Sequence, residues 1–138
     1  MSYYFFDTNI LVYLFDQSSL TKKQTAQNLL AQYSLEGGIA ISTQVLQEFF
    51  VVTTRKLASP LTIPNARHVL EKFLQLQVIL INGEMILSAT RLLEKYSISF
   101  WDALIIEAAK VSGAKVLLTE DLQHELEIEK ITLINPFT

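Results

Sequence analysis

Short apolar runs alternate with longer segments of helical periodicity along the whole chain. Continuous apolar runs bounded by polar residues are typical of buried strands, and apolar positions three and four apart are typical of amphipathic helices. The predicted strands lie at 3–6, 39–42, 78–81, 115–118 and 131–134, and the predicted helices at 8–15, 20–36, 43–57, 64–76, 83–96 and 100–112. This alternation favours a parallel sheet covered by helices on both faces, the doubly wound α/β class.

Glycine and proline mark several of the predicted helix ends. Gly37 and Gly38 are expected to stop helix 20–36, and Gly113 is expected to end helix 100–112. Pro64 stands at the start of helix 64–76, where its missing N–H has no cost.

Length and composition indicate a single cytoplasmic domain over residues 1–138. Half of the residues are hydrophobic and the mean hydropathy is +0.30, but no apolar run approaches the ~20 residues that a membrane span needs. The first residues lack the basic segment of a signal peptide, and Asp7 and Asp16 interrupt the apolar stretch that follows. Cysteine is absent, which excludes disulfides, thiolate catalysis and cysteine-ligated metal sites.

The net charge of −3 provides no global positive field for nucleic acid. Any phosphate binding must therefore be local. Arg55 and Lys56 form the basic pair nearest to the acids considered below, and they could hold a phosphate or simply stabilise the end of their helix.

Apolar surface is abundant for so small a domain, which suggests that a second copy or a different partner covers part of it. The apolar stripes of helices 20–36 and 44–57, including Phe49 and Phe50, could form a groove for a partner helix. Packing in the core would use the same residues.

Two aspartates follow predicted strands. In open parallel sheets, ligands bind beyond the carboxyl ends of the strands. Asp7 directly follows the first strand and Asp121 lies three residues past Leu118, so we expect both at one edge of the sheet. Asp7 could instead cap the next helix, and Asp121 could cap a turn. The neighbouring polar residues could contact these acids or only their own turns; they are Thr8, Asn9, Thr119 and Glu120.

Glu48 falls on the border of the apolar face of its helix, between Val51 and Val52. This is an unfavourable place for a carboxylate without a function. Pairing with Arg55 or Lys56 is the ordinary alternative.

Asp102 begins an apolar stripe that continues at Ile105, Ile106 and Ala109. A carboxylate in this position is expected at the floor of a cleft. A capping box with Ser99 would explain it equally well. The adjacent Trp101 could stack on a base, although core packing is the more common role of a tryptophan.

Gathering four carboxylates within a few ångströms is costly, since each close pair repels by about 4 kcal/mol at an effective dielectric constant near 20. A hard divalent cation would offset this repulsion. Oxygen ligands without cysteine or paired histidines favour Mg²⁺ or Mn²⁺ over zinc. The chemistry that this suggests is hydrolysis of a phosphate ester.

These segments resemble the PIN-domain nucleases, and in particular the small toxins of bacterial VapBC toxin–antitoxin pairs. The resemblance covers the whole chain: FFDTNILVYLF is similar to the family's opening strand, and ISTQVLQEFF, SFWDALIIEAA and LLTEDLQ are similar to its second, third and fourth motifs. It implies a three-layer sandwich with a central five-stranded parallel sheet, and endoribonuclease activity in which an activated water attacks the phosphodiester.

The resemblance also implies the site and the partners. One or two Mg²⁺ or Mn²⁺ ions would be held by four catalytic and metal-binding acids, Asp7, Glu48, Asp102 and Asp121, with support from Asn9 and Thr119. A homodimer and an inhibitory antitoxin are typical of the toxin branch. The alternative is a catalytically inert PIN-like module that binds RNA or protein, for which a missing acid would be the mark; none is missing.

Two questions stay open at this level. Glu120 and Asp121 are adjacent, so the fourth ligand is ambiguous, and Asp121 is chosen on the family pattern. Asp102 reaches the correct edge of the sheet only if helices 83–96 and 100–112 cross steeply.

Overall fold

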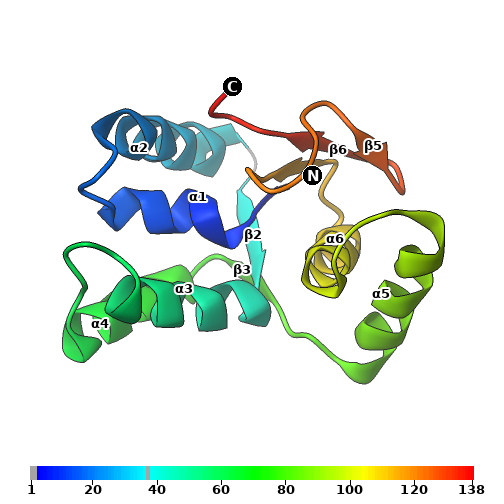
Figure 1. Ribbon diagram of the computed structural model, residues 1–138, viewed down its shortest axis with the longest axis horizontal. Helices are drawn as coiled ribbons and strands as arrows, with labels where there is room; N and C mark the ends of the chain where they lie inside the picture. Colours follow the sequence, from blue (N-terminus) through cyan, green and yellow to red (C-terminus); the bar gives the residue numbers. More distant parts are fainter. Residues whose placement is uncertain (1–2, 37) are drawn as a thin grey trace.

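The computed structural model describes residues 3–36 and 38–138, and Figure 1 shows a central sheet between two groups of helices. The strands are β1 (Tyr4–Phe6), β2 (Ile39–Ser42), β3 (Gln77–Ile79), β4 (Val116–Leu118), β5 (Glu127–Ile128) and β6 (Ile131–Ile134). The helices are α1 (Thr8–Val12), the 3-10 helix η1 (Tyr13–Phe15), α2 (Leu20–Glu36), α3 (Thr43–Arg55), α4 (Ile63–Phe73), α5 (Gly83–Lys95) and α6 (Phe100–Ser112).

The strand order in the sheet is β3-β2-β1-β4-β6-β5. All neighbours pair in parallel except β5, which is antiparallel to β6. The predicted five-stranded parallel sheet in an α/β fold is therefore confirmed, and β5 is an addition at its edge. The sequence did not predict β5, because its tight turn places Glu129 and Lys130 at positive φ without the glycine or asparagine that normally marks such turns.

Helices cover both faces of the sheet. In Figure 1, α1 to α4 lie on one side and α5 and α6 lie on the other. Because both faces are covered, the side chains of the central strands are buried on both faces of the sheet, which explains their continuous apolar runs. Phe5, Phe6, Leu117 and Leu118 are all at most 1% exposed.

Phe49 belongs to this core and not to a surface groove. It is fully buried and packs edge-to-face against Phe15 and Phe73, with ring centroids 5.8 and 5.0 Å away. The expectation that Phe49 helps to form a groove for a partner is therefore wrong, and the alternative of core packing is correct for this residue.

The strand register brings the carboxyl ends of β1 and β4 to the same level. Phe6 is aligned with Leu118, and the backbone N–H of Asp7 donates to the carbonyl oxygen of Leu118 at 3.0 Å. The residues that follow these strands are Asp7 and Thr119, and they therefore leave the sheet side by side.

Polar side chains define the starts of the helices. Ser42, Thr62, Asn82 and Ser99 each accept a hydrogen bond from a backbone N–H in the first turn of α3, α4, α5 and α6. These caps satisfy donors that have no partner within the helix. Pro64 lies in the first turn of α4, as expected.

The helix ends predicted at glycine are found where the structure describes them, whereas α3 and α4 end at Arg55 and Phe73, two and three residues before the predicted ends. Gly113 ends α6 in the left-handed conformation at φ 80°, which glycine adopts without steric cost. Gly38 has φ 86° and its N–H donates to the carbonyl of Tyr33. Gly37, the other predicted stop, lies outside the described residues.

Helices α5 and α6 pack against one another and cross steeply. Figure 1 shows α6 nearly end-on, whereas α5 lies along the plane of the view. This is the arrangement that the sequence required if Asp102, in the first turn of α6, was to reach the carboxyl edge of the sheet.

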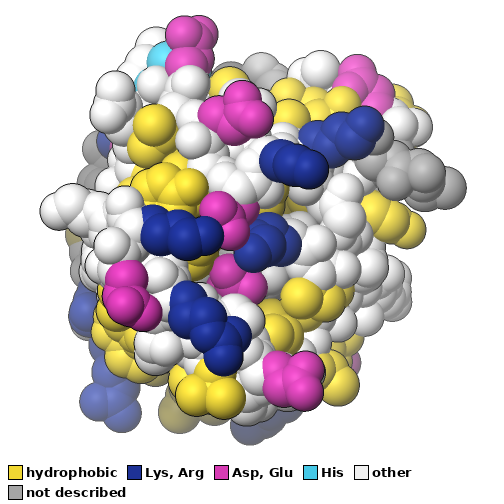
Figure 2. Space-filling view, turned by 90° about the vertical axis from the view of Figure 1, so that its right-hand side faces the viewer, with side chains coloured by type: hydrophobic (Ala, Val, Ile, Leu, Met, Phe, Trp, Pro, Cys, Tyr) yellow, Lys and Arg dark blue, Asp and Glu magenta, His cyan; other side chains and the backbone are white. Residues whose placement is uncertain are grey.

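The surface carries mixed charge. On the face that carries α5, lysine and arginine side chains are interspersed with acidic ones (Figure 2). Lys110 of α6, for example, contacts both Glu107 and Glu129 at 3.2 Å. Among the described residues, no helix is both long and apolar enough to cross a membrane.

Candidate active site

Asp7 is a buried carboxylate at the end of β1, with 4% of its surface exposed. Its Oδ1 atom accepts a hydrogen bond from the N–H of Thr8 at 2.7 Å, so Asp7 is the N-cap of α1. Its Oδ2 atom accepts a hydrogen bond from the hydroxyl of Thr119 at 2.8 Å. The capping role expected from the sequence is therefore correct, but it occupies one oxygen and leaves the other facing the edge of the sheet at β4.

Thr119 connects Asp7 to the loop after β4. Its buried hydroxyl donates to Asp7 and accepts a hydrogen bond from the backbone N–H of Asp121 at 3.1 Å. The Thr119 hydroxyl therefore closes the local turn. Asp121 is exposed, yet the pKa of its carboxyl is raised, first by desolvation and then by the charges of Asp102 and Glu120.

Asp102 stands in the first turn of α6, where Ser99 is the N-cap. The Ser99 hydroxyl accepts a hydrogen bond from the N–H of Asp102 at 3.0 Å, which is one half of the capping box. The carboxylate of Asp102 lies close to those of Asp7 and Asp121. Asp102, like Asp7, therefore takes part in a helix cap and also belongs to the acidic group.

Asp7, Asp102 and Asp121 form an acidic triad. One carboxylate oxygen from each lies within 4.8 Å of the other two. The three residues come from the end of β1, the start of α6 and the loop after β4, so the fold alone brings them together. Oxygen atoms at this spacing suit the coordination sphere of a hard cation.

Glu48 lies beside the triad. Its Oε1 atom accepts a hydrogen bond from the hydroxyl of Thr8 at 2.6 Å, and its Oε2 atom accepts one from the amide of Gln44 at 3.4 Å. Its negative charge raises the pKa of all three aspartates. Within the described residues Glu48 makes no ion pair with Arg55 or Lys56. The alternative that Glu48 only pairs with one of these basic residues is therefore wrong.

Burial is the main cause of the altered acidity in the triad. Desolvation raises the pKa of Asp7 from 3.8 to about 7, against the hydrogen bonds from Thr119 and Thr8, which lower it. Desolvation also raises the pKa of Asp102 and Asp121, with a further contribution from Asp102 to Asp121. Clustered carboxyl groups with raised pKa values are characteristic of functional sites.

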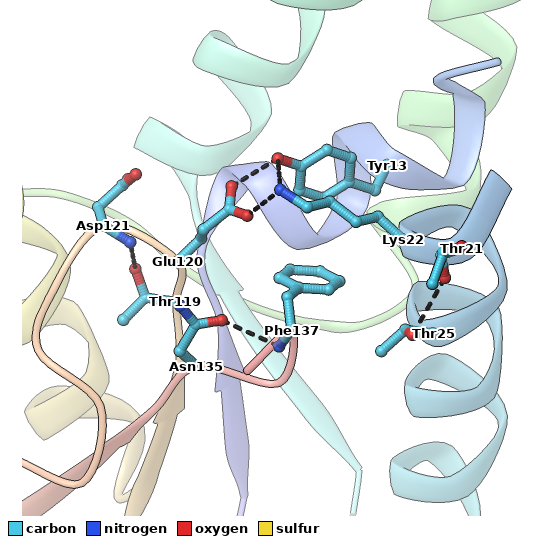
Figure 3. Close-up of polar contacts among 9 residues, drawn as sticks. All are labelled: Tyr13, Thr21, Lys22, Thr25, Thr119, Glu120, Asp121, Asn135 and Phe137. Carbon is cyan, nitrogen blue, oxygen red and sulfur yellow. Dashed lines mark hydrogen bonds and ion pairs between the residues drawn. The ribbon is translucent and has the colours of Figure 1, made fainter. Parts of the chain in front are cut away.

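Glu120 is turned away from the triad. Its carboxylate contacts Lys22 and the hydroxyl of Tyr13 on the far side of the loop (Figure 3). Of the two adjacent acids, Asp121 is the one whose carboxylate joins Asp7 and Asp102.

A cleft of about 620 Å³ opens beside the triad. Its polar lining residues are Asp7, Thr8, Asn9, Tyr13, Asp16, Gln47, Glu48, Lys56 and Asp121. The apolar wall is contributed by α1 and by the end of α3 and the residues after it, namely Val12, Val51, Val52 and Leu57. Charged and apolar lining residues in one cleft suit a ligand that carries both charge and apolar surface.

Trp101 does not pack in the core. Its side chain is 61% exposed and lies edge-to-face against Phe100 at 5.2 Å between centroids. The preference for core packing is therefore wrong. Its carbonyl accepts a hydrogen bond from the amide of Gln44 at 3.2 Å, which ties α3 to the start of α6.

Sequence reasoning missed Gln44, Tyr13 and Lys22. Gln44 could have been found, because it precedes Glu48 by four residues and therefore lies on the same face of the helix. Tyr13 and Lys22 contact Glu120 across 107 and 98 residues of chain, and no local pattern signals such contacts.

An α/β fold with three clustered aspartates at the carboxyl edge of its sheet is consistent with the active site of a nuclease. Comparison with known proteins identifies the family. The PIN domain model matches residues 4–126, and the chain therefore belongs to the PIN-domain family. A comparison with curated proteins gave no match.

Solved structures of toxins and toxin–antitoxin complexes share the fold. A toxin–antitoxin complex from Klebsiella pneumoniae is 22% identical, with a TM-score of 0.70 and coverage of 96% of each chain. VapBC2 from Rickettsia felis, bound to a promoter DNA fragment, is 23% identical, with a TM-score of 0.68 over 95% of this chain and 96% of that chain. VapC20 of Mycobacterium tuberculosis, a toxin that cleaves the sarcin-ricin loop, is 18% identical, with a TM-score of 0.64 over 83% and 86%.

Proposed function

We propose that this protein is a Mg²⁺- or Mn²⁺-dependent endoribonuclease and the toxin of a type II toxin–antitoxin pair. The observation that carries the proposal is the triad of Asp7, Asp102 and Asp121, whose oxygens lie within 4.8 Å of one another at the carboxyl edge of the sheet. Membership of the PIN-domain family and the fold shared with toxins support the same activity.

The donor set fits a hard divalent cation. The triad supplies only oxygen atoms, which select Mg²⁺ or Mn²⁺ over zinc. The buried Oδ1 atom of Asn9 has no hydrogen-bond partner within the described residues, so an acceptor beside Asp121 is still available. A bound cation would polarise the phosphodiester and promote ionisation of the attacking water.

The chain's own residues hold this arrangement in place. Both oxygens of Asp7 are oriented by hydrogen bonds, from Thr8 and Thr119, and Glu48 is oriented by Thr8 and Gln44. We propose that Asp7, Asp102, Asp121 and Glu48 hold the cation directly or through its waters, with Asn9 and Thr119 in support. Lys56, in the wall of the cleft, would contact a phosphate of the RNA backbone.

RNA cleavage by the purified protein tests the proposal. Wild type is expected to cut a mixture of tRNA, rRNA and mRNA with Mg²⁺ or Mn²⁺ and to stop with EDTA. Asp7→Asn and Asp102→Asn should each lose cleavage. Glu71→Gln removes the same charge from an exposed position of α4, outside the lining of the cleft, and it should retain most of the activity.

The outcomes separate the proposal from its alternative. Cleavage that persists in Asp7→Asn would contradict the role of the triad. Tight Mn²⁺ binding without cleavage of any RNA would favour the catalytically inert PIN-like module that binds RNA or protein. Growth arrest on expression of wild type, but not of Asp7→Asn, would support the role as a toxin.

We also propose a homodimer and a cognate antitoxin as partners. Support for a dimer comes from α5, which exposes Ile86, Leu87 and Leu93 by 41, 57 and 39%. Light scattering on the isolated protein should show twice the mass of the chain, and a strictly monomeric protein would contradict this part. A single domain over residues 1–138 and a cytoplasmic location stay predictions.

A further inference from the structure

Glu120 stands between two residues that belong to the acidic site, yet its own side chain leaves the site. Thr119 on one side donates to Asp7, and Asp121 on the other side joins the triad. Figure 3 shows the carboxylates of Glu120 and Asp121 apart from one another, with that of Glu120 next to Tyr13 and Lys22. Glu120 lies inside the turn that the Asp121 N–H and the Thr119 hydroxyl close, so contacts that hold the Glu120 side chain outside the site also restrict the backbone that carries Asp121.

Glu120 is held by two donors at once. The hydroxyl of Tyr13 donates to its Oε1 atom and the ammonium of Lys22 donates to its Oε2 atom. Lys22 also donates to the Tyr13 oxygen at 3.1 Å, which closes a ring of three contacts. Because the carboxylate and the ammonium are both charged, these hydrogen bonds are of the strong kind.

Phe137, in the C-terminal segment, also contacts Lys22. The Lys22 ammonium lies 4.9 Å from the ring centroid of Tyr13 and 5.5 Å from that of Phe137, and the two rings meet edge-to-face at 5.0 Å. The Oδ1 atom of Asn135 accepts a hydrogen bond from the N–H of Phe137 at 2.9 Å. Cation–π contacts of this kind restrict an otherwise flexible lysine.

We infer that Lys22 and Tyr13 are positioning residues, which hold Glu120 so that Asp121 stays within the acidic triad. In this arrangement Glu120 is not a ligand of the cation, and Lys22 compensates the charge that Glu120 would otherwise add beside Asp121. The inference rests on the proposed function for its consequence in catalysis, but the arrangement of the loop can be measured without RNA.

The direct test is Mn²⁺ binding, measured by electron paramagnetic resonance, in Lys22→Met and Tyr13→Phe. Loss of a residue that orients a ligand typically weakens metal affinity by about 10- to 100-fold, and we expect a loss of about 10-fold in Lys22→Met. Lys22→Arg should restore most of the affinity. Lys23→Met is the matched control, because Lys23 has the same intermediate burial as Lys22 and, among the side chains of the described residues, donates a hydrogen bond only to Gln17.

A charge exchange separates positioning from ligation. The double variant Lys22→Glu with Glu120→Lys keeps an ion pair of reversed polarity, and we expect it to bind Mn²⁺ more tightly than either single variant. If Glu120→Gln abolished binding while Lys22→Met bound as tightly as wild type, Glu120 would be a ligand and the inference would be overturned. Unchanged affinity in both variants would also overturn it.

Hydrogen exchange at the Asp121 amide distinguishes this inference from the proposed function. That amide donates to Thr119, so its exchange should accelerate in Lys22→Met and Tyr13→Phe and stay unchanged in Lys23→Met. Faster exchange in a protein that cuts no RNA would retain the inference and reject the nuclease. Cleavage by wild type with unchanged Asp121 exchange in both variants would retain the nuclease and reject the inference.

Discussion

At the scale of single residues, Asp7 combines a structural and a chemical role. It caps α1 through one oxygen and contacts Thr119 through the other. The short helix and the site therefore depend on the same side chain. The burial of Asp7 disfavours its ionised form, since desolvation is the largest cause of its raised pKa.

This cost predicts how the stability of the metal-free protein depends on pH. The pKa of Asp7 is 3.8 in the unfolded chain and about 7 in the folded protein. Between these values the folded state binds a proton that the unfolded state has released, so the free energy of unfolding falls as pH rises from about 4 to about 7 and then levels off. At about 1.4 kcal/mol per pH unit, the fall is on the order of 4 kcal/mol at most.

Chemical denaturation in EDTA at a series of pH values measures this effect. Asp7→Asn cannot ionise and keeps a good N-cap residue, so it should lack this fall and be more stable than wild type at pH values above about 7. The control Glu71→Gln, at an exposed position of α4, should follow wild type. A pH profile of Asp7→Asn identical to that of wild type would assign the dependence to other groups.

Thr119 is expected to matter through its hydroxyl alone. Thr119→Val keeps the shape of the side chain but leaves the Oδ2 atom of Asp7 and the N–H of Asp121 without their partner. A buried polar group left without a partner costs about 1–3 kcal/mol, and RNA cleavage should fall with the loss of orientation. Thr119→Ser retains the hydroxyl and should therefore retain most of the stability, measured by urea denaturation, and most of the rate of RNA cleavage. Equal loss in Thr119→Ser would indicate a packing role instead.

At the scale of elements, the five parallel strands could be predicted because each contains a short run of mostly apolar residues. The positions of two of the site residues followed from these strands. Asp7 and Asp121 were placed by topology, since they follow strands whose carboxyl ends share an edge. Asp102 could not be placed in the same way, because its position depends on the steep crossing of α5 and α6, and the crossing angle is set by packing between helices that no local pattern encodes.

The start of α6 provides a test at this scale. Ser99 accepts a hydrogen bond from the N–H of Asp102 at 3.0 Å, so Ser99→Ala should lower the free energy of unfolding by about 1 kcal/mol, as is usual for the loss of an N-cap. Ser99→Thr should retain the cap, and Ser97→Ala, at an exposed position before the helix, should have little effect. Urea denaturation measures all three, and equal stability of Ser99→Ala and Ser97→Ala would contradict the capping role.

At the scale of the whole molecule, the least predictable contacts are those that join distant segments. The group formed by Tyr13, Lys22 and Glu120 unites the first helices with the loop after β4, and none of its members has a distinctive sequence environment. The acids themselves were found because a carboxylate is out of place beside apolar residues, as with Glu48. Lysine and tyrosine at half-exposed positions raise no such conflict, which is why their role emerges only from the fold.

The repulsion within the triad predicts that a divalent cation stabilises the whole fold. A ligand that binds only the folded state adds about 2.7 kcal/mol at a concentration 100 times its dissociation constant, which raises the melting temperature of a domain of this size by roughly 8 °C.

Because binding favours the ionised form of Asp7, whose pKa is raised to about 7, the cation's affinity should fall as pH falls below about 7. Thermal unfolding with and without Mn²⁺ at pH 6 and pH 8, at about equal ionic strength, measures both effects. The rise in melting temperature should be larger at the higher pH, absent in Asp102→Asn and retained in Glu71→Gln, whose position lies outside the cleft. An equal rise in both variants would show that Mn²⁺ acts on scattered surface acids and not on the triad.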